Sequence, residues 1–270
     1  MEHIGDVLKQ QWQNINGGGK SGYHCDLCHD TGYIFEGDVA IRCQCRKEED
    51  LIRKQKRAGI TPHLRHMTFA HFDYSLFSDE KQGSNGLTFR ENVHRIVAAA
   101  ESFVEDIANG RTVSGLLLQG YVGRGKTYLA ASIANALVER DVDVRFIVVP
   151  DFLDELRATF DTSSMGSESE LMNLIKTAPV LILDDLGAHN YTDWSIKTLF
   201  AILNYRINYE LPIVVTTNLS VESMDELLGT RITSRLVEAC RFFQMNETND
   251  IRMVKRHREQ IRARRQHESD

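Results

Sequence analysis

The residues with the clearest chemical potential form a glycine-rich segment that ends in a lysine and a threonine. Residues 120–127 read GYVGRGKT, which fits the pattern G-x-x-x-x-G-K-[ST]. An apolar run, SGLLLQ, precedes this segment, and a helical pattern, TYLAASIANALVER, overlaps its end. Backbone N–H groups of such a loop, together with a helix N-terminus, surround the phosphates of a nucleotide. We therefore expect a phosphate-binding loop here and not a chance glycine-rich turn.

The side chains of this loop predict its ligands. Lys126 can bridge the β- and γ-phosphate oxygens, and the Thr127 hydroxyl can ligate Mg²⁺. ATP and Mg²⁺ are therefore the expected cofactors. Arg124 is a bulky residue that the pattern permits, and its role is left unassigned. The remaining residues expected to contact the nucleotide are Gly120, Tyr121, Val122, Gly123 and Gly125.

Polar residues directly follow two further apolar runs, and these residues are candidates for the same nucleotide site. The run PVLIL leads into Asp184 and Asp185, and PIVVTT leads into Asn218. At a strand edge beside the phosphate loop, Asp184 could orient Mg²⁺ and Asp185 could polarise the attacking water. The Asn218 amide could reach between the γ-phosphate and the water, although an isolated asparagine here is more often a turn residue. Lys126, Asp185 and Asn218 are thus catalytic candidates.

Three arginines follow the last of these residues. Arg231 and Arg235 are four positions apart on a predicted helix, and this spacing places them on one face. One of them could reach a neighbouring subunit's site as an arginine finger, and the alternative is a solvated basic face. Arg252 is a candidate for touching the nucleotide from its own subunit.

Four of the five cysteines form a second candidate site. Cys25, Cys28, Cys43 and Cys45 have the spacing C-x₂-C and C-x-C. In a cytoplasmic protein such a cluster indicates a zinc site and not disulfides. His24 or His29 could replace one thiolate, and a redox role is the alternative. A segment with so little apolar sequence needs a metal to fold, which favours zinc.

Five apolar runs alternate with helical patterns along the rest of the chain. Short buried strands separated by helices predict an α/β fold with a five-stranded parallel sheet flanked by helices. The runs are 114–119, 142–149, 179–184, 212–217 and 240–245. The expected divisions are 1–22 (helix and flexible tether), 23–60 (zinc-binding module with a basic helix), 61–86 (connector), 87–255 (ATPase domain) and 256–270 (basic tail).

Composition limits the class of protein. The 270 residues carry a net charge of −6, with 42% hydrophobic and 26% charged residues. Such a composition is typical of a soluble globular protein. No apolar run approaches the ~20 residues of a membrane helix, and the polar amino terminus lacks a signal peptide, so we expect a cytoplasmic protein.

Residues 252–265 are strongly basic and could contact nucleic-acid phosphates, or form a solvated helix. Phe69 and Phe72 could pack near an adenine, or belong to the core.

The order of these elements resembles that of the AAA+ ATPases. The segments LLLQGYVGRGKTYLAASIANAL, VLILDDLGA, PIVVTTNLS and LLGTRITSRL are similar to the DnaC/DnaI family of bacterial and phage replicative helicase loaders and to its relative IstB, a transposition helper. The segment GYHCDLCHDTGYIF, followed by RCQCRK, resembles the amino-terminal part of phage and Gram-positive loaders. IstB-type helpers typically lack such a module.

This resemblance implies roles for individual residues. It implies Asn218 as sensor 1, Arg235 as the arginine finger with Arg231 beside it, and Arg252 as sensor 2. Asp185 stands where many AAA+ proteins have glutamate, and loaders of the DnaI type often show this aspartate.

The resemblance also implies an activity: ATP-dependent loading of a hexameric replicative DNA helicase onto single-stranded DNA by an ATP-dependent homo-oligomer. An IstB-type transposition helper is the first alternative. A monomeric phosphoryl-transfer enzyme, such as a small-molecule kinase without a trans arginine, is the second.

Overall fold

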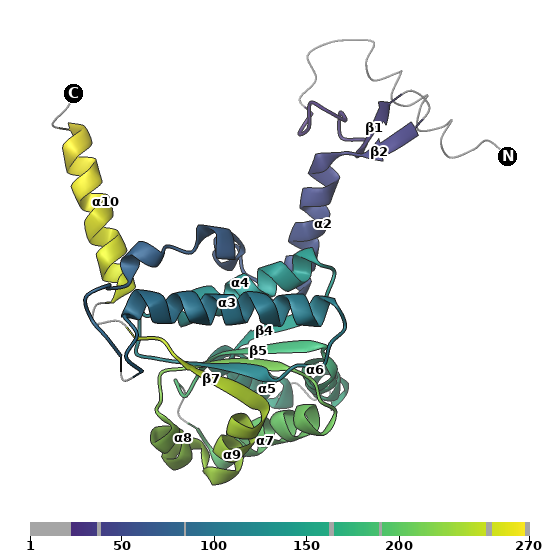
Figure 1. The fold of residues 1–270 in the computed structure, drawn as a ribbon. Helices are drawn as coiled ribbons and strands as arrows, with labels where there is room; N and C mark the ends of the chain where they lie inside the picture. Colours follow the sequence, from purple (N-terminus) through teal and green to yellow (C-terminus); the bar gives the residue numbers. More distant parts are fainter. Residues whose placement is uncertain are drawn as a thin grey trace. The chain divides into compact units, whose positions relative to one another are not determined.

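The computed structural model describes residues 23–36, 39–83, 85–161, 165–188, 191–246 and 250–267. The chain divides into two compact units, Met1–Lys56 and Arg57–Asp270 (Figure 1). The expected amino-terminal helix and tether, residues 1–22, lie outside the described residues.

The first unit is built around a short hairpin. Strand β1 (Tyr33–Glu36) pairs antiparallel with β2 (Val39–Arg42), and helix α2 (Gln44–Arg57) follows. A turn precedes the hairpin, and in it His29, Asp30 and Gly32 all have positive φ angles. Such a turn reverses the chain within a few residues and brings the first two cysteines back toward the start of α2.

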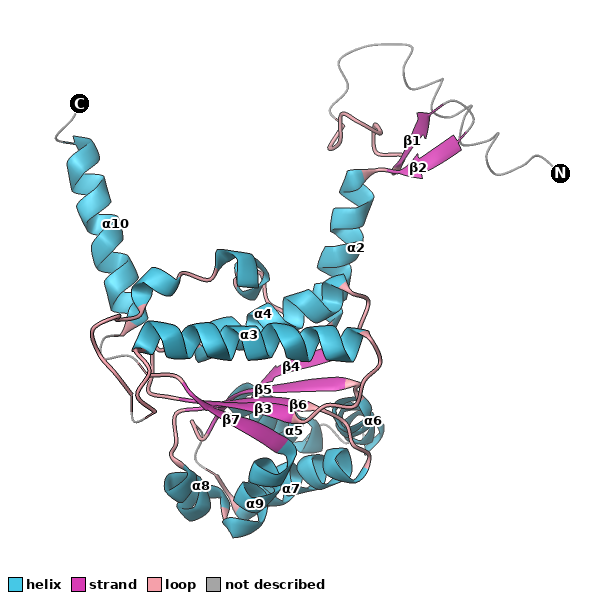
Figure 2. Cartoon of the chain, in the orientation of Figure 1, coloured by secondary structure: helices cyan, strands magenta, loops and turns pink. Residues whose placement is uncertain are grey.

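The second unit contains the predicted five-stranded sheet. Its order is β4-β5-β6-β3-β7, and every neighbouring pair is parallel (Figures 1 and 2). Each strand falls within a predicted apolar run or overlaps it, which confirms the sequence expectation. The strands are β3 (Gly115–Gln119), β4 (Val144–Val148), β5 (Val180–Leu186), β6 (Ile213–Thr217) and β7 (Cys240–Gln244).

Helices cover both faces of this sheet (Figure 2). Helices α3 and α4 lie on one face, and α5 to α9 lie on the other. On that second face their apolar residues form one core with strand residues such as Leu117, Leu181 and Val215, because alternate residues of a strand point to the same side. The bounds are α3 (Phe89–Ala108), α4 (Lys126–Glu139), α5 (Val149–Asp161), α6 (Met165–Thr177), α7 (Asp193–Asn208), α8 (Val221–Leu228) and α9 (Thr230–Ala239).

The remaining segments join and extend this body. The connector contains three 3₁₀ turns, η1 (Leu64–His66), η2 (Phe69–His71) and η3 (Tyr74–Leu76), and the basic carboxy-terminal segment forms helix α10 (Ile251–His267). The sequence division at residue 256 therefore falls inside a helix. Within the described ranges, none of the helices has the length and apolar character that crossing a bilayer requires.

Candidate functional site

The glycine-rich segment connects strand β3 to helix α4, as predicted. Gly123 and Gly125 have φ angles of +74° and +85°, a conformation that strongly favours glycine. Close packing adds a second constraint: a Cβ on Gly120 would lie 2.5 Å from the Met245 carbonyl oxygen, and one on Gly123 would overlap the Asp250 carboxylate. These glycines therefore permit both the shape of the loop and its tight contacts.

Lys126 is held inside this loop. Its ammonium group donates to the carbonyl oxygens of Gly120 at 2.7 Å and Tyr121 at 3.0 Å, and the residue is only 8% exposed. Burial lowers the pKa of Lys126, while Asp185 and Asp184 counteract this effect. The Tyr121 and Val122 side chains are exposed, so the loop would bind phosphate with its backbone and not with these side chains.

Asp184 is the buried member of the acidic pair at the end of β5. It is 4% exposed and accepts a 2.6 Å hydrogen bond from the Thr216 hydroxyl. Burial raises the pKa of Asp184, and hydrogen bonds from Thr216 and Thr127 lower it in part. Thr127 therefore lies next to Asp184. A hydroxyl beside a carboxylate is an oxygen-ligand set suited to Mg²⁺, so these two residues fit the predicted metal site.

Asp185 has a different environment from its neighbour. It is half-buried, and its φ angle is +61°. Such a positive φ angle is uncommon for a residue other than glycine. The pairing register between β5 and β6 also shifts between Leu183 and Leu186. A local irregularity of this kind re-aims side chains next to functional sites. The two adjacent carboxylates therefore have different local environments.

Asn218 follows β6, the strand that lies between β3 and β5. Strand β6 therefore separates the acidic strand β5 from the phosphate-loop strand β3, while the end of β5 still lies beside the loop, where Thr127 hydrogen-bonds Asp184. All these strands are parallel, so their carboxyl ends bring Lys126, Asp184 and Asn218 to one edge of the sheet. The Oδ1 atom of Asn218 is buried and has no hydrogen-bond partner among the described residues, which suits an atom reserved for a ligand or water.

The arginines separate into two groups. Arg252, at the start of α10, is close enough to Lys126 to contribute to the lowering of its pKa. The backbone N–H of Ile251 donates to the Gly123 carbonyl at 2.9 Å, which attaches this end of α10 to the phosphate loop.

Arg235 lies on α9 and forms an ion pair with Glu238 at 3.0 Å. Arg231 is exposed on the same helix. The contacts found for these two arginines in the described part of the chain include no residue of the phosphate loop or the acidic pair. Of the three arginines, Arg252 is therefore the one that the structure places at the phosphate loop.

The two aromatic candidates also separate. Phe72 stacks on Phe77 and lines a cavity of about 40 Å³ beside Gly125. That volume holds roughly one water, so an adenine could enter only if the lining side chains moved. Phe69 lines a different and larger cavity, between α3 and α4. Only Phe72 therefore lies where an adenine contact was expected.

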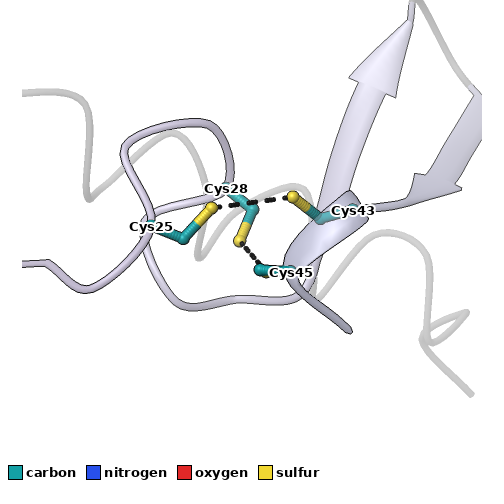
Figure 3. Close-up of side chains that lie close together, drawn as sticks. All are labelled: Cys25, Cys28, Cys43 and Cys45. Carbon is teal, nitrogen blue, oxygen red and sulfur yellow. Dashed lines mark hydrogen bonds between the residues drawn. The ribbon is translucent and has the colours of Figure 1, made fainter. Parts of the chain in front are cut away.

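The four cysteines converge in the first unit (Figure 3). All four sulfurs lie within 4.8 Å of one another, with 3.7 Å from Cys25 to Cys43 and 3.4 Å from Cys28 to Cys45. Four sulfurs around zinc at about 2.3 Å would be about 3.8 Å apart, so the cluster fits a tetrahedral zinc site. Backbone N–H groups of Cys28 and Leu27 lower the pKa of Cys25 to about 7, whereas the Cys28 thiol and burial raise the pKa of Cys45.

The histidines considered as substitute ligands are placed differently. Among the described residues, the cluster contains cysteines only. His24 has an almost fully exposed side chain that lies 3.6 Å from Asp30, and the His29 ring packs against Tyr23. The arrangement favours four thiolates.

Sequence reasoning missed the two threonines that end β6. Thr216 bonds both acidic residues, and Thr217 donates to the Leu186 carbonyl at 2.7 Å. The signal was the pair of hydroxyl side chains in PIVVTTN, directly before the sensor candidate.

Comparison with known proteins identifies related sequences. The IstB-like ATP-binding protein family matches residues 42–260. The replicative helicase loader DnaI of Bacillus subtilis is 35% identical over 111 residues, which are 41% of this chain and 35% of DnaI, so the match spans about a third of that relative. The loader DnaC of Escherichia coli is 25% identical over 201 residues, which are 73% of this chain and 75% of DnaC.

Solved structures show the same fold. The crystal structure of DnaI superposes on this protein with a TM-score of 0.56 at 27% sequence identity. The matched region comprises 73% of this chain and 99% of the DnaI chain in that structure. DnaA from Aquifex aeolicus, bound to AMPPCP, has a TM-score of 0.51 at 20% identity, over 63% of this chain and 52% of that chain, and shares the AAA+ fold. The chain therefore belongs to the IstB-like ATP-binding protein family and is a homologue of the DnaI and DnaC replicative helicase loaders.

Proposed function

We propose that this protein is a cytoplasmic ATPase that loads a hexameric replicative DNA helicase onto single-stranded DNA. The observation that carries the proposal is the single sheet edge that bears the phosphate loop, Asp184, Asp185 and Asn218, in a chain homologous to DnaC over 73% of its length. This arrangement supports hydrolysis of a bound nucleoside triphosphate.

Each side chain has a role in that reaction. The Lys126 ammonium leaves its two loop carbonyls and neutralises charge on the β- and γ-phosphates. Asp185 polarises the attacking water, and the Asn218 amide orients it. Thr127 and Asp184 would hold Mg²⁺, which supplies charge neutralisation to the phosphate oxygens when bound.

The arginine helix suggests that the active form is an assembly. Arg235 is proposed to act on the site of a neighbouring protomer, with Arg231 beside it, whereas Arg252 acts on the site of its own protomer. ATP would then favour a homo-oligomer, because the nucleotide of one protomer completes its charge balance with the next protomer's arginine.

The cysteine module is proposed to bind zinc and to contact the helicase. Its four sulfurs lie close together and fit a closed structural site, which leaves no open position for a substrate. A folded module of this kind offers a rigid surface for a protein partner.

A transposition helper is the second candidate, because the matching family model is named for IstB. That match begins at residue 42 and excludes Cys25 and Cys28. The first two cysteines of the site therefore lie outside the region shared with the IstB-like family, which favours the helicase-loader proposal over the transposition helper.

A pull-down with the cognate replicative helicase tests the proposal. The helicase should be retained by the protein with ATP, and single-stranded DNA should stimulate release of the helicase in the presence of hydrolysable nucleotide. Retention of a transposase and not of the helicase would select the alternative. A Cys28→Ser variant serves as the control for the contribution of the cysteine module.

A further inference from the structure

The ends of β5 and β6 are joined by side-chain hydroxyls and not only by the backbone ladder. The register shifts between Leu183 and Leu186, so regular pairing is interrupted at the two acidic residues. Thr217 donates to the Leu186 carbonyl at 2.7 Å just beyond the shift. Thr216 occupies the shift itself, and it is only 1% exposed.

The Thr216 hydroxyl bonds both carboxylate residues at once. It donates to Asp184 Oδ1 at 2.6 Å and accepts the backbone N–H of Asp185 at 2.9 Å. An ionised carboxylate only accepts, so the single hydroxyl proton must point to Asp184, and a lone pair then faces Asp185. One oxygen atom therefore fixes the side chain of the first aspartate and the backbone of the second.

The backbone of Asp185 needs such support. Its φ angle is +61°. This is a strained conformation for a residue other than glycine, and strained backbone persists where its surroundings hold it. Valine in place of Thr216 would keep the shape of the side chain but leave the N–H of Asp185 and one oxygen of the buried Asp184 without this partner.

From this geometry we propose that Thr216 is a positioning residue for ATP hydrolysis. It holds Asp184 against Thr127, where both would face Mg²⁺, and it holds Asp185 in the orientation that reaches the attacking water. This inference rests on the proposed ATPase activity. In this role Thr216 touches neither the nucleotide nor the water, because its hydroxyl proton and one of its lone pairs are taken by the two aspartates.

Three variants test the proposal. Thr216→Val should lower kcat about ten- to hundredfold, the usual effect of removing hydrogen bonds to a charged group, while KM for ATP changes less than about threefold. Thr216→Ser keeps the hydroxyl and should stay within about threefold of the parent kcat. Thr198→Val removes a buried hydroxyl that donates to the Trp194 carbonyl on α7, away from the site, and should leave kcat unchanged.

A second readout does not depend on turnover. The dissociation constant of a fluorescent ADP analogue is measured in Mg²⁺ and in EDTA for each variant. The gain in affinity that Mg²⁺ provides should shrink at least threefold in Thr216→Val and stay intact in Thr216→Ser. If the valine variant does not fold, Thr216→Ala compared with Thr216→Ser isolates the hydroxyl, because both lack the methyl group.

The possible results are distinct. A Thr216→Val protein with the parent kcat and the parent Mg²⁺ effect overturns the proposal. Equal losses in Thr216→Val and Thr198→Val that follow their melting temperatures also overturn it, because they indicate a structural role only. If the parent protein binds nucleotide without hydrolysing it, the ATPase proposal fails, while the Mg²⁺ effect in Thr216→Val still decides whether Thr216 positions Asp184.

Discussion

Lys126 and Asp184 are opposite charges that are both removed from water at one sheet edge. Burial is the largest influence on each of them, and it lowers the pKa of the lysine and raises the pKa of the aspartate. Charge interactions are stronger where water is excluded. A bound triphosphate would therefore meet a carboxylate and an ammonium that are both shielded from water, once the Lys126 ammonium has left the carbonyl oxygens of Gly120 and Tyr121.

The first prediction at this scale concerns the phosphate-loop lysine. Lys126→Ala should weaken ATP binding at least tenfold, because it removes the cation expected between the β- and γ-phosphates. Equilibrium titration with a fluorescent ATP analogue measures this change, with Lys197→Ala, an exposed lysine on α7, as the matched control. Parent-like affinity in Lys126→Ala would remove the assignment of the loop as a nucleotide site.

The second prediction separates binding from turnover. Asp185→Asn should bind ATP normally and lose hydrolysis by about a hundredfold or more, since the amide cannot polarise water as the carboxylate does. Steady-state phosphate release measures the loss. Asp141→Asn is a suitable control, because Asp141 also has a φ angle of +61° but lies in the turn after α4. Undiminished turnover in Asp185→Asn would show that another residue activates the water.

At the scale of elements, the strands could be predicted and their order could not. Runs such as PVLIL and PIVVTT are short, apolar and β-branched, so their burial in a parallel sheet follows from composition. The position of β6 between β3 and β5 depends on contacts between distant segments, which no local pattern encodes. Thr216 was missed for a related reason. Threonine is common in strands, and its hydroxyl can bond both Asp184 and Asp185 only because the pairing register shifts at that point.

The cysteine module gives the third prediction. Purified protein should contain one zinc per chain, and chelation should unfold the module while ATP binding persists, because structural zinc supplies ~10 kcal/mol or more of folding free energy. Elemental analysis and nucleotide titration before and after chelation measure both effects. Cys28→Ser should lose the metal, whereas Cys240→Ser, at a buried cysteine of β7, should keep it. Metal-free protein with an ordered hairpin would refute the zinc site.

Arg206 gives a fourth prediction, about the end of the sheet opposite the site. It is fully buried on α7, and burial lowers its pKa to about 9. Its guanidinium donates to five backbone carbonyls, those of Ile175, Lys176, Ala178, Pro179 and Pro212.

Arg206→Leu should lower the free energy of unfolding by about 3 kcal/mol or more, because several buried carbonyls lose their partner. Denaturant titration measures this loss. The exposed Arg140→Leu should cost much less. Equal stability of Arg206→Leu and the parent would contradict the structural role.

At the scale of the whole molecule, the candidate arginines differ in their distance from the phosphate loop. Arg252 lies near Lys126 of the phosphate loop in the same chain, whereas Arg235 is paired with Glu238 on α9. A site that hydrolyses ATP efficiently needs a further cation at the γ-phosphate, and trans arginines contribute about 10³-fold or more in related reactions. We propose that a second copy of the chain supplies that cation.

The fifth prediction tests this division between protomers. Arg235→Ala should bind ATP as the parent does, because its side chain would belong to the neighbour's site, but hydrolysis should fall by orders of magnitude. Mixing Arg235→Ala with Lys126→Ala should restore part of the activity, since an intact loop then meets an intact arginine across one interface. Phosphate release is measured across mixing ratios and concentrations. If cross-linking shows that the two variants assemble together but no activity is recovered, Arg235 acts within its own protomer or has only a structural role. Arg231 would then be tested in the same way.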